Sequence, residues 1–279
     1  MDSTQVPKIP SGDIRESDEQ QSGTIRVLAR GLRVLKSFTP RNNWLSNSEI
    51  ADIVDLPKPT VSRITAALTN MGYLSYAYAT GRYRLAPPVL ALGYRARMGL
   101  GVPAIARPLM QALANEQDAL VVLAEHEDMA MVCDEVCHSE SSIVTLRVHR
   151  GSRLTLPFSA AGRAYLGALG QAERDRLCAE IQRRFPQAWS QVREGIWQAA
   201  EEISERGFCV TIESLERGIN GVGVSIDLPN ARSRYVLGCA GPAPYFPREH
   251  LEQVIGPAML DIKRRIEASF NPAAQPRLA

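Results

Sequence analysis

The most constraining feature of this chain is a basic amino-terminal segment, residues 24–86, in which three helical patterns are followed by a strand-like one. In the first pattern, apolar residues recur every three or four positions up to Pro40, which predicts an amphipathic helix. The predicted buried face consists of Ile25, Leu28, Leu32, Leu35 and Phe38. Arg26, Arg30 and Arg33 fall outside that face.

A second, short helix is predicted after Ser46. Serine is a good N-cap, and Glu49 three residues later completes a capping box, in which two orphan backbone N–H groups are satisfied reciprocally. The apolar positions expected to face the core are Ile50, Ile53 and Val54.

A third helix is predicted after the turn Asp55-Leu56-Pro57, because Pro59 is tolerated in a first helical turn and Gly72 is a typical stop. Its inner face is expected to carry Val61, Ile64, Leu68 and Met71. Two short helices around a tight turn, the second with small polar and basic residues in its first turns, are typical of a major-groove recognition helix. The predicted DNA-binding residues of this helix are Lys58, Pro59, Thr60, Ser62 and Arg63, with Arg63 foremost.

A β-hairpin is predicted next, because two aromatic-rich runs, Tyr73–Ala79 and Arg82–Leu85, flank the turn Thr80-Gly81. Attached to a helix-turn-helix, such a hairpin is a wing, and Arg82 and Arg84 are expected to enter the minor groove or contact the phosphate backbone. The alternative is that these arginines only form a solvated face.

Charge is distributed unevenly along the chain. Between Thr24 and Ala86 there are nine basic and three acidic side chains, although the whole chain carries a formal net charge of only +2. A strongly basic segment beside a nearly neutral larger one is the electrostatic pattern expected of a DNA-contacting module joined to another domain.

The length of 279 residues favours two domains. Residues 1–23 lack the apolar core of a secretory signal and are interpreted as a disordered acidic tail. No stretch has the roughly 18 consecutive apolar residues of a membrane span. Five cysteines, an odd number, favour reduced buried thiols over a disulfide framework, which points to the cytoplasm.

The remainder of the chain alternates between strand-like and helical patterns. Helices are expected over 103–117, 159–169, 171–182, 191–205 and 248–268, and strands over 120–124, 129–133, 143–148, 208–212, 222–226 and 235–240. A turn is expected at His126-Glu127-Asp128. Strands in hairpins with helices segregated around them predict an α+β fold with an antiparallel sheet.

The sequence resembles the IclR family of bacterial transcription regulators. The resemblance lies in Leu56-Pro57-Lys58-Pro59-Thr60-Val61-Ser62-Arg63, Gly72-Tyr73-Leu74 and Gly81-Arg82-Tyr83-Arg84-Leu85, and resumes in Leu156-Pro157-Phe158-Ser159-Ala160-Ala161-Gly162-Arg163-Ala164 and Gly241-Pro242. It spans roughly residues 24–268, and the ordered set of motifs is more specific than any one of them.

The resemblance implies a winged helix-turn-helix over 24–86, a linker helix over 87–102, a GAF-like effector-binding domain over 103–270 and a tail over 271–279. It also implies homodimers that can pair into homotetramers on double-stranded operator DNA. Val89, Leu90 and Leu92 of the linker helix are then expected to pack against a second subunit, or alternatively within one chain.

The resemblance also implies an effector site. By position it falls on Ser159, Ala160, Ala161, Gly162, Thr211, Glu213, Asn220, Gly221, Gly238, Cys239 and Ala240. Relatives that bind short keto-acids carry an acidic pair and a cysteine where this chain has Thr211-Ile212 and Gly221, and serines where it has Gly238 and Ala240. Smaller, less polar walls favour a bulkier organic acid, such as an aromatic one. Alternatively, Phe158, Phe208 or Tyr235 fills the space.

Other constellations are weaker. Cys133, Cys137 and His138 lack a second ligand pair at zinc spacing, so a metal site is disfavoured. Cys239 lies in an apolar strand pattern and is interpreted as an inert thiol rather than a nucleophile. The carboxylates Glu125, Glu127, Asp128, Asp134 and Glu135 are expected to face solvent. No P-loop, dinucleotide fingerprint or serine elbow is present, so neither a cofactor nor an enzyme is predicted.

The sequence therefore predicts a DNA-binding transcriptional regulator controlled by a small organic acid. Two alternatives remain: a regulator whose second domain only oligomerises, and an enzyme or interaction module fused to a winged helix. The identity of the effector, the target genes and the choice between repression and activation stay open.

Overall fold

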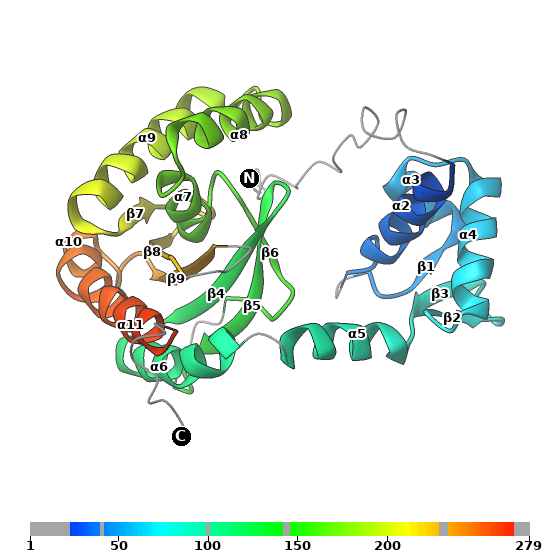
Figure 1. The fold of residues 1–279 in the computed structure, drawn as a ribbon, viewed down its shortest axis with the longest axis horizontal. Helices are drawn as coiled ribbons and strands as arrows, with labels where there is room; N and C mark the ends of the chain where they lie inside the picture. Colours follow the sequence, from blue (N-terminus) through cyan, green and yellow to red (C-terminus); the bar gives the residue numbers. More distant parts are fainter. Residues whose placement is uncertain (1–22, 40–41, 99–100, 142–145, 229–233, 271–279) are drawn as a thin grey trace, which may run out of the picture. The chain divides into compact units, whose positions relative to one another are not determined.

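The computed structural model describes residues 23–39, 42–98, 101–141, 146–228 and 234–270. Within these ranges the chain forms two compact units, one amino-terminal up to residue 98 and one carboxy-terminal from residue 101 (Figure 1). The two tails predicted at the chain ends lie almost entirely outside the described residues, as does most of the strand predicted over 143–148.

The amino-terminal unit is a helical core flanked by a small sheet. Its elements are α2 (Gly23–Lys36), β1 (Leu45–Ser46), α3 (Asn47–Val54), α4 (Lys58–Asn70), β2 (Leu74–Ala77), β3 (Arg82–Leu85) and α5 (Pro87–Met98). The three strands pair antiparallel in the order β1-β3-β2. The predicted wing is therefore present as β2 and β3, with β1 added along its β3 edge.

Local sequence signals fix the start of α3. Ser46 adopts an extended backbone, its Oγ accepts from the Glu49 N–H, and Glu49 returns a hydrogen bond to the Ser46 N–H at 2.8 Å. The predicted capping box is confirmed. Two predictions about burial were wrong: Ile53 is exposed, whereas Ala51 is buried, and Met71 is 61% exposed, whereas Thr65 is fully buried. Helical periodicity defines a face only to within about one position, and neighbouring helices decide which residues are covered.

The apolar face of α2 differs from the prediction. Leu28 is 64% and Leu32 is 51% exposed, and Val27 beside them is exposed as well. The helix instead presents Val34 to the core, and the Arg33 guanidinium donates to the backbone oxygen of Val54 on α3. Of the predicted face, Leu35 and Phe38 do pack against the core of this unit, whereas Leu28 and Leu32 do not.

The carboxy-terminal unit contains a six-stranded antiparallel sheet in the order β6-β5-β4-β9-β8-β7. Its strands are β4 (Leu120–Glu127), β5 (Ala130–His138), β6 (Arg153–Thr155), β7 (Cys209–Ile212), β8 (Ile219–Ile226) and β9 (Tyr235–Pro242). Its helices are α6 (Gly101–Gln117), α7 (Ala160–Gly167), α8 (Gln171–Arg184), α9 (Trp189–Arg206), α10 (Arg248–His250), the π-helical turn η1 (Leu251–Ile255) and α11 (Gly256–Ser269). The predicted α+β fold is confirmed.

Helices cover both faces of this sheet (Figure 1). On one face, α6 and α11 pack on alternate residues such as Val121, Leu237 and Cys239, which form the largest apolar cluster. On the other face, α7 lies directly on the strands, with α8 and α9 outside it. The period of two along each strand sends neighbouring residues to different faces, so the sheet divides the core in two.

Several details of this unit were not predicted. The hairpin turn falls at Asp128-Met129 instead of His126-Glu127-Asp128, and Asp128 takes a left-handed backbone conformation. Residues 146–149 form no strand, whereas β6 was missed because it is only three residues long. Among the described residues, no helix combines the length and apolarity needed to cross a bilayer.

Candidate DNA interface and candidate effector site

The amino-terminal end of α4 is the candidate recognition surface. Lys58, Pro59, Ser62 and Arg63 are exposed, and Thr60 is half-buried, so four of the five predicted residues are accessible. Among the described residues, Lys58 and Arg63 have no ion-pair partner. No side chain caps this helix end, and although the Thr60 amide donates to the Pro57 carbonyl at 2.9 Å, the end keeps the partial positive charge of the helix dipole. The surface therefore suits a polyanion.

Thr65 fixes the angle between α3 and α4. Its hydroxyl donates to the Oδ1 of Asn47 on α3 at 2.9 Å, and lies within hydrogen-bonding distance of the Val61 carbonyl in its own helix. Sequence reasoning missed this residue because a threonine within a helix carries no burial signal of its own. The contact holds the two helices of the helix-turn-helix in one relative orientation.

The two wing arginines have different surroundings. Arg82 donates to the backbone oxygen of Trp44 at 2.9 Å and pairs with Glu49 at 3.1 Å, so it ties the hairpin to the start of α3. Glu49 has a lowered pKa, chiefly because it accepts the Ser46 N–H, so it is ionised and available to Arg82. Arg84 is exposed, and its guanidinium lies over the Trp44 ring, 5.2 Å from the centroid. Within the described residues it has no carboxylate partner.

Aromatic rings line the hairpin. Tyr76 packs on Tyr83 at 4.7 Å and meets Tyr78 edge-on at 5.0 Å, and Tyr78 itself is 91% exposed. The turn residue Gly81 has φ +65, a conformation that glycine adopts readily. The hairpin is thus stiffened by ring contacts while its tip stays accessible.

The small-residue helix α7 sits on glycines of the sheet. A Cβ at Gly223 would overlap the Ala160 carbonyl, and a Cβ at Gly221 or Gly238 would lie 3.4 Å from the methyl group of Ala160 or Ala161. The helix begins at Ser159, whose Oγ accepts the Gly162 N–H at 3.0 Å. This cap leaves the first two amides of α7, those of Ala160 and Ala161, without an acceptor inside the helix.

The predicted effector residues fall into two groups. Ser159, Ala160, Ala161, Gly221 and Gly238 meet at the start of α7, and Thr211 and Ala240 lie on the same side of the sheet by strand alternation. We call these residues, with Val122 beside Gly238, the α7 site. Cys239 and Asn220 project from the opposite side. Asn220 there bonds the Phe246 carbonyl at 2.9 Å and accepts the Glu213 N–H at 3.0 Å.

The α7 site has an apolar border that the sequence did not reveal. Val122, Leu120 and Cys133 form a small buried cluster. The side chains packed against it are Val136, Leu146, Val148 and Leu154. Of the aromatic residues considered as pocket fillers, Phe208 and Tyr235 belong to the opposite core, whereas Phe158 packs on Phe185 at 5.6 Å.

Two further polar side chains lie close to α7: Arg163 on the helix itself and His126 on β4. The guanidinium of Arg163 is accommodated by Gly195 on α9, where a Cβ would approach its Cζ to 2.5 Å, and its Nε donates to the Pro157 carbonyl. Burial lowers the pKa of Arg163. His126 stacks on Tyr165 with ring centroids 4.5 Å apart, and burial lowers the pKa of this histidine.

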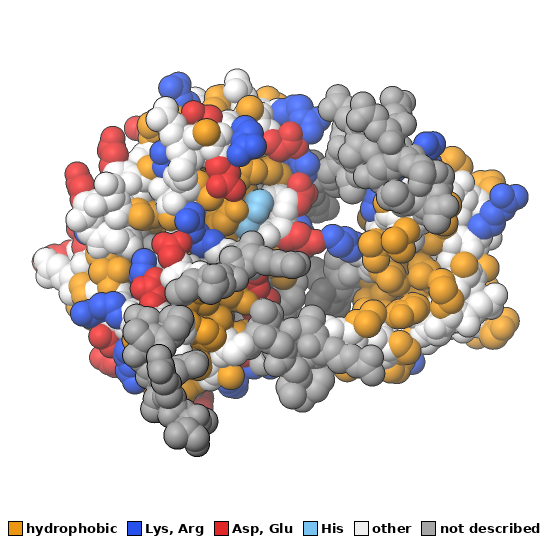
Figure 2. Space-filling view, in the orientation of Figure 1, with side chains coloured by type: hydrophobic (Ala, Val, Ile, Leu, Met, Phe, Trp, Pro, Cys, Tyr) orange, Lys and Arg blue, Asp and Glu red, His pale blue; other side chains and the backbone are white. Residues whose placement is uncertain are grey.

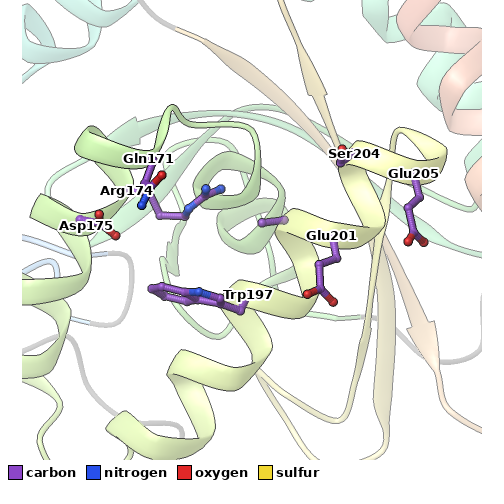
Figure 3. Close-up of a pocket in the computed structure, with 8 residues that line it drawn as sticks. Gln171, Arg174, Asp175, Trp197, Glu201, Ser204 and Glu205 are labelled. Carbon is purple, nitrogen blue, oxygen red and sulfur yellow. The ribbon is translucent and has the colours of Figure 1, made fainter.

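A separate surface groove of about 470 Å³ runs between α8 and α9. Figure 3 shows Trp197 and Glu201 of α9 opposite Arg174 and Asp175 of α8. Arg174 also donates to the Gly167 carbonyl at 3.1 Å. None of the predicted site residues lines this groove.

The cysteines are buried and do not converge on a metal. Cys133 and Cys137 belong to different apolar clusters on the two sides of β5, so they cannot share an ion. Burial raises the pKa of Cys133 and Cys239 to about 12, which keeps both as thiols at neutral pH. Within the described residues, no group of three or more metal-ligating side chains is found.

A winged helix-turn-helix joined to an α+β domain defines a class of DNA-binding regulators, and the comparisons place the chain within it. The family model described as IclR helix-turn-helix domain matches residues 27–77, and the one described as bacterial transcriptional regulator IclR C-terminal matches residues 96–267. The chain therefore belongs to the IclR family of transcriptional regulators.

Individual relatives agree. The chain is 29% identical over 262 residues to the HTH-type transcriptional regulator TsaQ1/TsaQ2 of Comamonas testosteroni, covering 93% of this chain and 94% of that protein. The crystal structure of an IclR family transcriptional regulator from Brucella abortus has a TM-score of 0.81 at 36% identity, covering 94% of this chain and 98% of that one. These relatives are named as regulators and not as enzymes, as the sequence indicated.

A more distant solved structure contains a ligand. It is an IclR homolog from Microbacterium hydrocarbonoxydans complexed with 4-hydroxybenzoate. Its TM-score is 0.69 at 20% identity, covering 88% of this chain and 98% of that one. This similarity establishes a shared fold.

Proposed function

We propose that this protein is a sequence-specific operator-binding homo-oligomer whose affinity for DNA is controlled by a small aromatic carboxylic acid bound at the α7 site. The observation that carries this proposal is the convergence of free helix amides, glycines and an apolar border at the start of α7. The protein acts in the cytoplasm, where bacterial operator DNA lies.

The carboxylate of the effector would bind the amides of Ala160 and Ala161. A helix N-terminus favours anions because its N–H groups and dipole point outward. A Cβ at Gly238 would lie 3.9 Å from the Ala161 nitrogen, so the missing side chain lets this end of the helix lie close to the sheet. Ser159 already satisfies the third amide, which leaves two donors for two carboxylate oxygens.

The aromatic ring would lie against the apolar border of Val122, Leu146 and Val148. Such a surface contributes hydrophobic contact and no hydrogen-bonding groups, which suits a ring better than a short keto-acid. The relative complexed with 4-hydroxybenzoate provides a precedent for this class of ligand within the fold.

DNA contact is assigned to Lys58, Pro59, Thr60, Ser62 and Arg63 at the start of α4, together with Arg84 on the wing. Arg84 takes priority over Arg82, because Arg82 is already neutralised by Glu49 and bonded to Trp44. A stacked arginine without a carboxylate partner is available to a phosphate at little further ordering cost.

A second copy of the chain would cover the exposed apolar side chains of α2 and α5. Figure 2 shows hydrophobic side chains gathered over the α2 side of the amino-terminal unit. The exposed apolar residues of these two helices are Val27, Leu28, Leu32, Leu90 and Leu92. Two subunits would also match the two half-sites that most helix-turn-helix regulators read.

The test is differential scanning calorimetry of the full chain with 4-hydroxybenzoate, benzoate, glyoxylate and 4-hydroxybenzyl alcohol. At about 100 times its Kd, a ligand adds roughly 2.7 kcal/mol to the unfolding free energy, enough for a shift of several degrees. The proposal expects shifts with the two aromatic acids and none with the alcohol, which lacks the carboxylate. No shift with any of the compounds would favour a domain that only oligomerises.

A further inference from the structure

Glu135 is a fully buried carboxylate held by two arginines from different elements. Its side chain on β5 is 0% exposed, although the sequence pattern predicted that it faces solvent. Arg107 of α6 donates from Nη1 to its Oε1 at 2.6 Å, and Arg150 donates from Nε at 2.9 Å and from Nη2 at 2.5 Å. The prediction of solvent exposure was wrong because partners 28 and 15 residues away are invisible to a local pattern.

Such a carboxylate makes its partners interdependent. Charge-assisted bonds of this kind are short and strong, and removing one partner of a buried ion pair leaves charge uncompensated. Both arginines bind the same oxygen, Oε1, so a displacement of either guanidinium changes the electrostatic attraction between Glu135 and the other arginine. The two elements that supply them are therefore linked through one atom.

One partner belongs to the helix that enters the carboxy-terminal unit. Arg107 lies in α6, which follows α5 in the chain, and α5 follows the wing. Gln111, one turn further along α6, donates to the His138 carbonyl at the end of β5 at 2.8 Å. The thiol of Cys137 lies 3.8 Å from the Arg107 carbonyl. α6 is thus fixed on β5 at two successive turns.

The other partner belongs to the segment that borders the α7 site. Arg150 lies within residues 146–154, whose Leu146, Val148 and Leu154 pack beside Val122. The amide of Gly151 donates to the Cys133 carbonyl at 2.7 Å, and the Val148 carbonyl lies 2.8 Å from His138 Nε2. His138 therefore contacts both the segment and, through its own carbonyl, α6.

We propose that Glu135 is the positioning residue that couples the α7 site to α6, so that displacement of segment 146–154 is transmitted to the helix leading to the DNA-binding unit. The link is mechanical and exists without ligand. Its regulatory meaning rests on the proposed function, in which a ligand on the α7 amides contacts Leu146 and Val148 of this segment. Such a ligand shifts the equilibrium only if it binds one arrangement of the segment better than the other.

The natural cysteines report on both sides of this link. Cys133 lies under segment 146–154, and Cys137 lies under α6. Buried thiols react with a thiol reagent only when the structure above them opens locally. The experiment treats the full chain with N-ethylmaleimide and measures the labelling rate of each of the five cysteines by peptide mass spectrometry.

Each variant removes one arginine and is read at the far cysteine. In Arg107→Met we expect Cys133 to react roughly tenfold faster, and in Arg150→Met we expect the same of Cys137, since local opening sets the rate. Glu135→Gln should raise both. The matched control is Arg183→Met on α8, which removes an arginine paired with Glu180 and not with Glu135, and it should leave the rates of Cys133 and Cys137 unchanged.

Two outcomes would overturn the coupling. In the first, each variant raises only the cysteine on its own side. In the second, all five rates rise together, which would mean that Glu135 supports the whole fold. Because no ligand is involved, success here combined with no calorimetric shift from any acid would reject the proposed effector while the coupling stands.

Discussion

The DNA-facing surface of the amino-terminal unit and the carboxy-terminal unit treat their cationic side chains differently. In the carboxy-terminal unit, arginines such as Arg150, Arg184 and Arg234 are matched with carboxylates, and one of those carboxylates is fully buried. In the amino-terminal unit, Lys58, Arg63 and Arg84 have no carboxylate partner among the described residues. What the carboxy-terminal unit leaves unpaired is a helix N-terminus bordered by glycines.

This difference separates two tasks. A cationic side chain without an internal partner raises the affinity for any polyanion, because no ion pair has to be broken when DNA binds. Paired charges add little to binding but keep helices and loops in register. Arginine therefore serves recognition where it lacks a carboxylate partner, as at Arg63 and Arg84, and positioning where it has one, as at Arg150 and Arg82.

The largest expected effect is that of Arg63→Ala on operator affinity. Loss of a side chain that reads a base edge or phosphate should cost about 1 to 3 kcal/mol, or roughly 5- to 150-fold in Kd. Fluorescence anisotropy with an operator selected from a random duplex library measures it. Arg183→Ala, which removes a paired arginine, is the control, and equal Kd values for the two variants would erase the distinction between the units.

The wing allows the same comparison within one hairpin. Arg84→Ala should reduce the slope of log K against log salt by about 1, because one phosphate contact is lost. Arg82→Met should leave that slope unchanged and lower the unfolding free energy of the amino-terminal unit, because its contacts with Trp44 and Glu49 are internal. A reduced slope in Arg82→Met together with an unchanged slope in Arg84→Ala would reverse the roles given to the two arginines.

A smaller effect is expected at Gly238. In Gly238→Ala the new Cβ would lie 3.0 Å from Val122 Cγ2 and 3.4 Å from the Ala161 Cβ, and would crowd the side of the α7 amides. We expect it to abolish the calorimetric shift caused by 4-hydroxybenzoate while lowering stability by about 1 kcal/mol. Gly170→Ala, where no atom lies within 4 Å of the new Cβ, is the control and should keep the shift. A full shift in Gly238→Ala would exclude the α7 site.

The smallest effect concerns acid stability and His126. Burial lowers the pKa of this histidine below its usual 6.5, so the unfolded chain binds a proton more readily than the folded one. Its contribution to stability is complete above pH 6.5 and is lost as the pH falls through the folded-state pKa. Urea unfolding at pH 7.5 and 5.5 should show a smaller loss in His126→Phe, which keeps a ring against Tyr165.

Sequence patterns predicted those features that depend on residues close together in the chain. The Ser46–Glu49 capping box, the Gly81 turn and most of the helices and strands of the carboxy-terminal unit depend on residues close in sequence. The start of α7 was recognisable from small residues and from the family resemblance. These features made the class of protein and the general position of the site predictable.

Features set by distant partners were not predictable. Glu135 looked solvent-facing, Thr65 carried no burial signal, and the exposure of Leu28 depends on which face of α2 the amino-terminal unit covers. Strand alternation across the sheet also separates Cys239 from Gly238, two neighbours in sequence that the resemblance had placed in one site.

The most direct test of the account is operator affinity of the full chain with and without 4-hydroxybenzoate at fixed salt. The account predicts that a saturating concentration changes the Kd for the selected operator by about 5- to 150-fold, a coupling of roughly 1 to 3 kcal/mol. It also predicts that Gly238→Ala binds the operator but loses this response. Calorimetrically proven binding of the acid with an unchanged operator Kd would contradict the account.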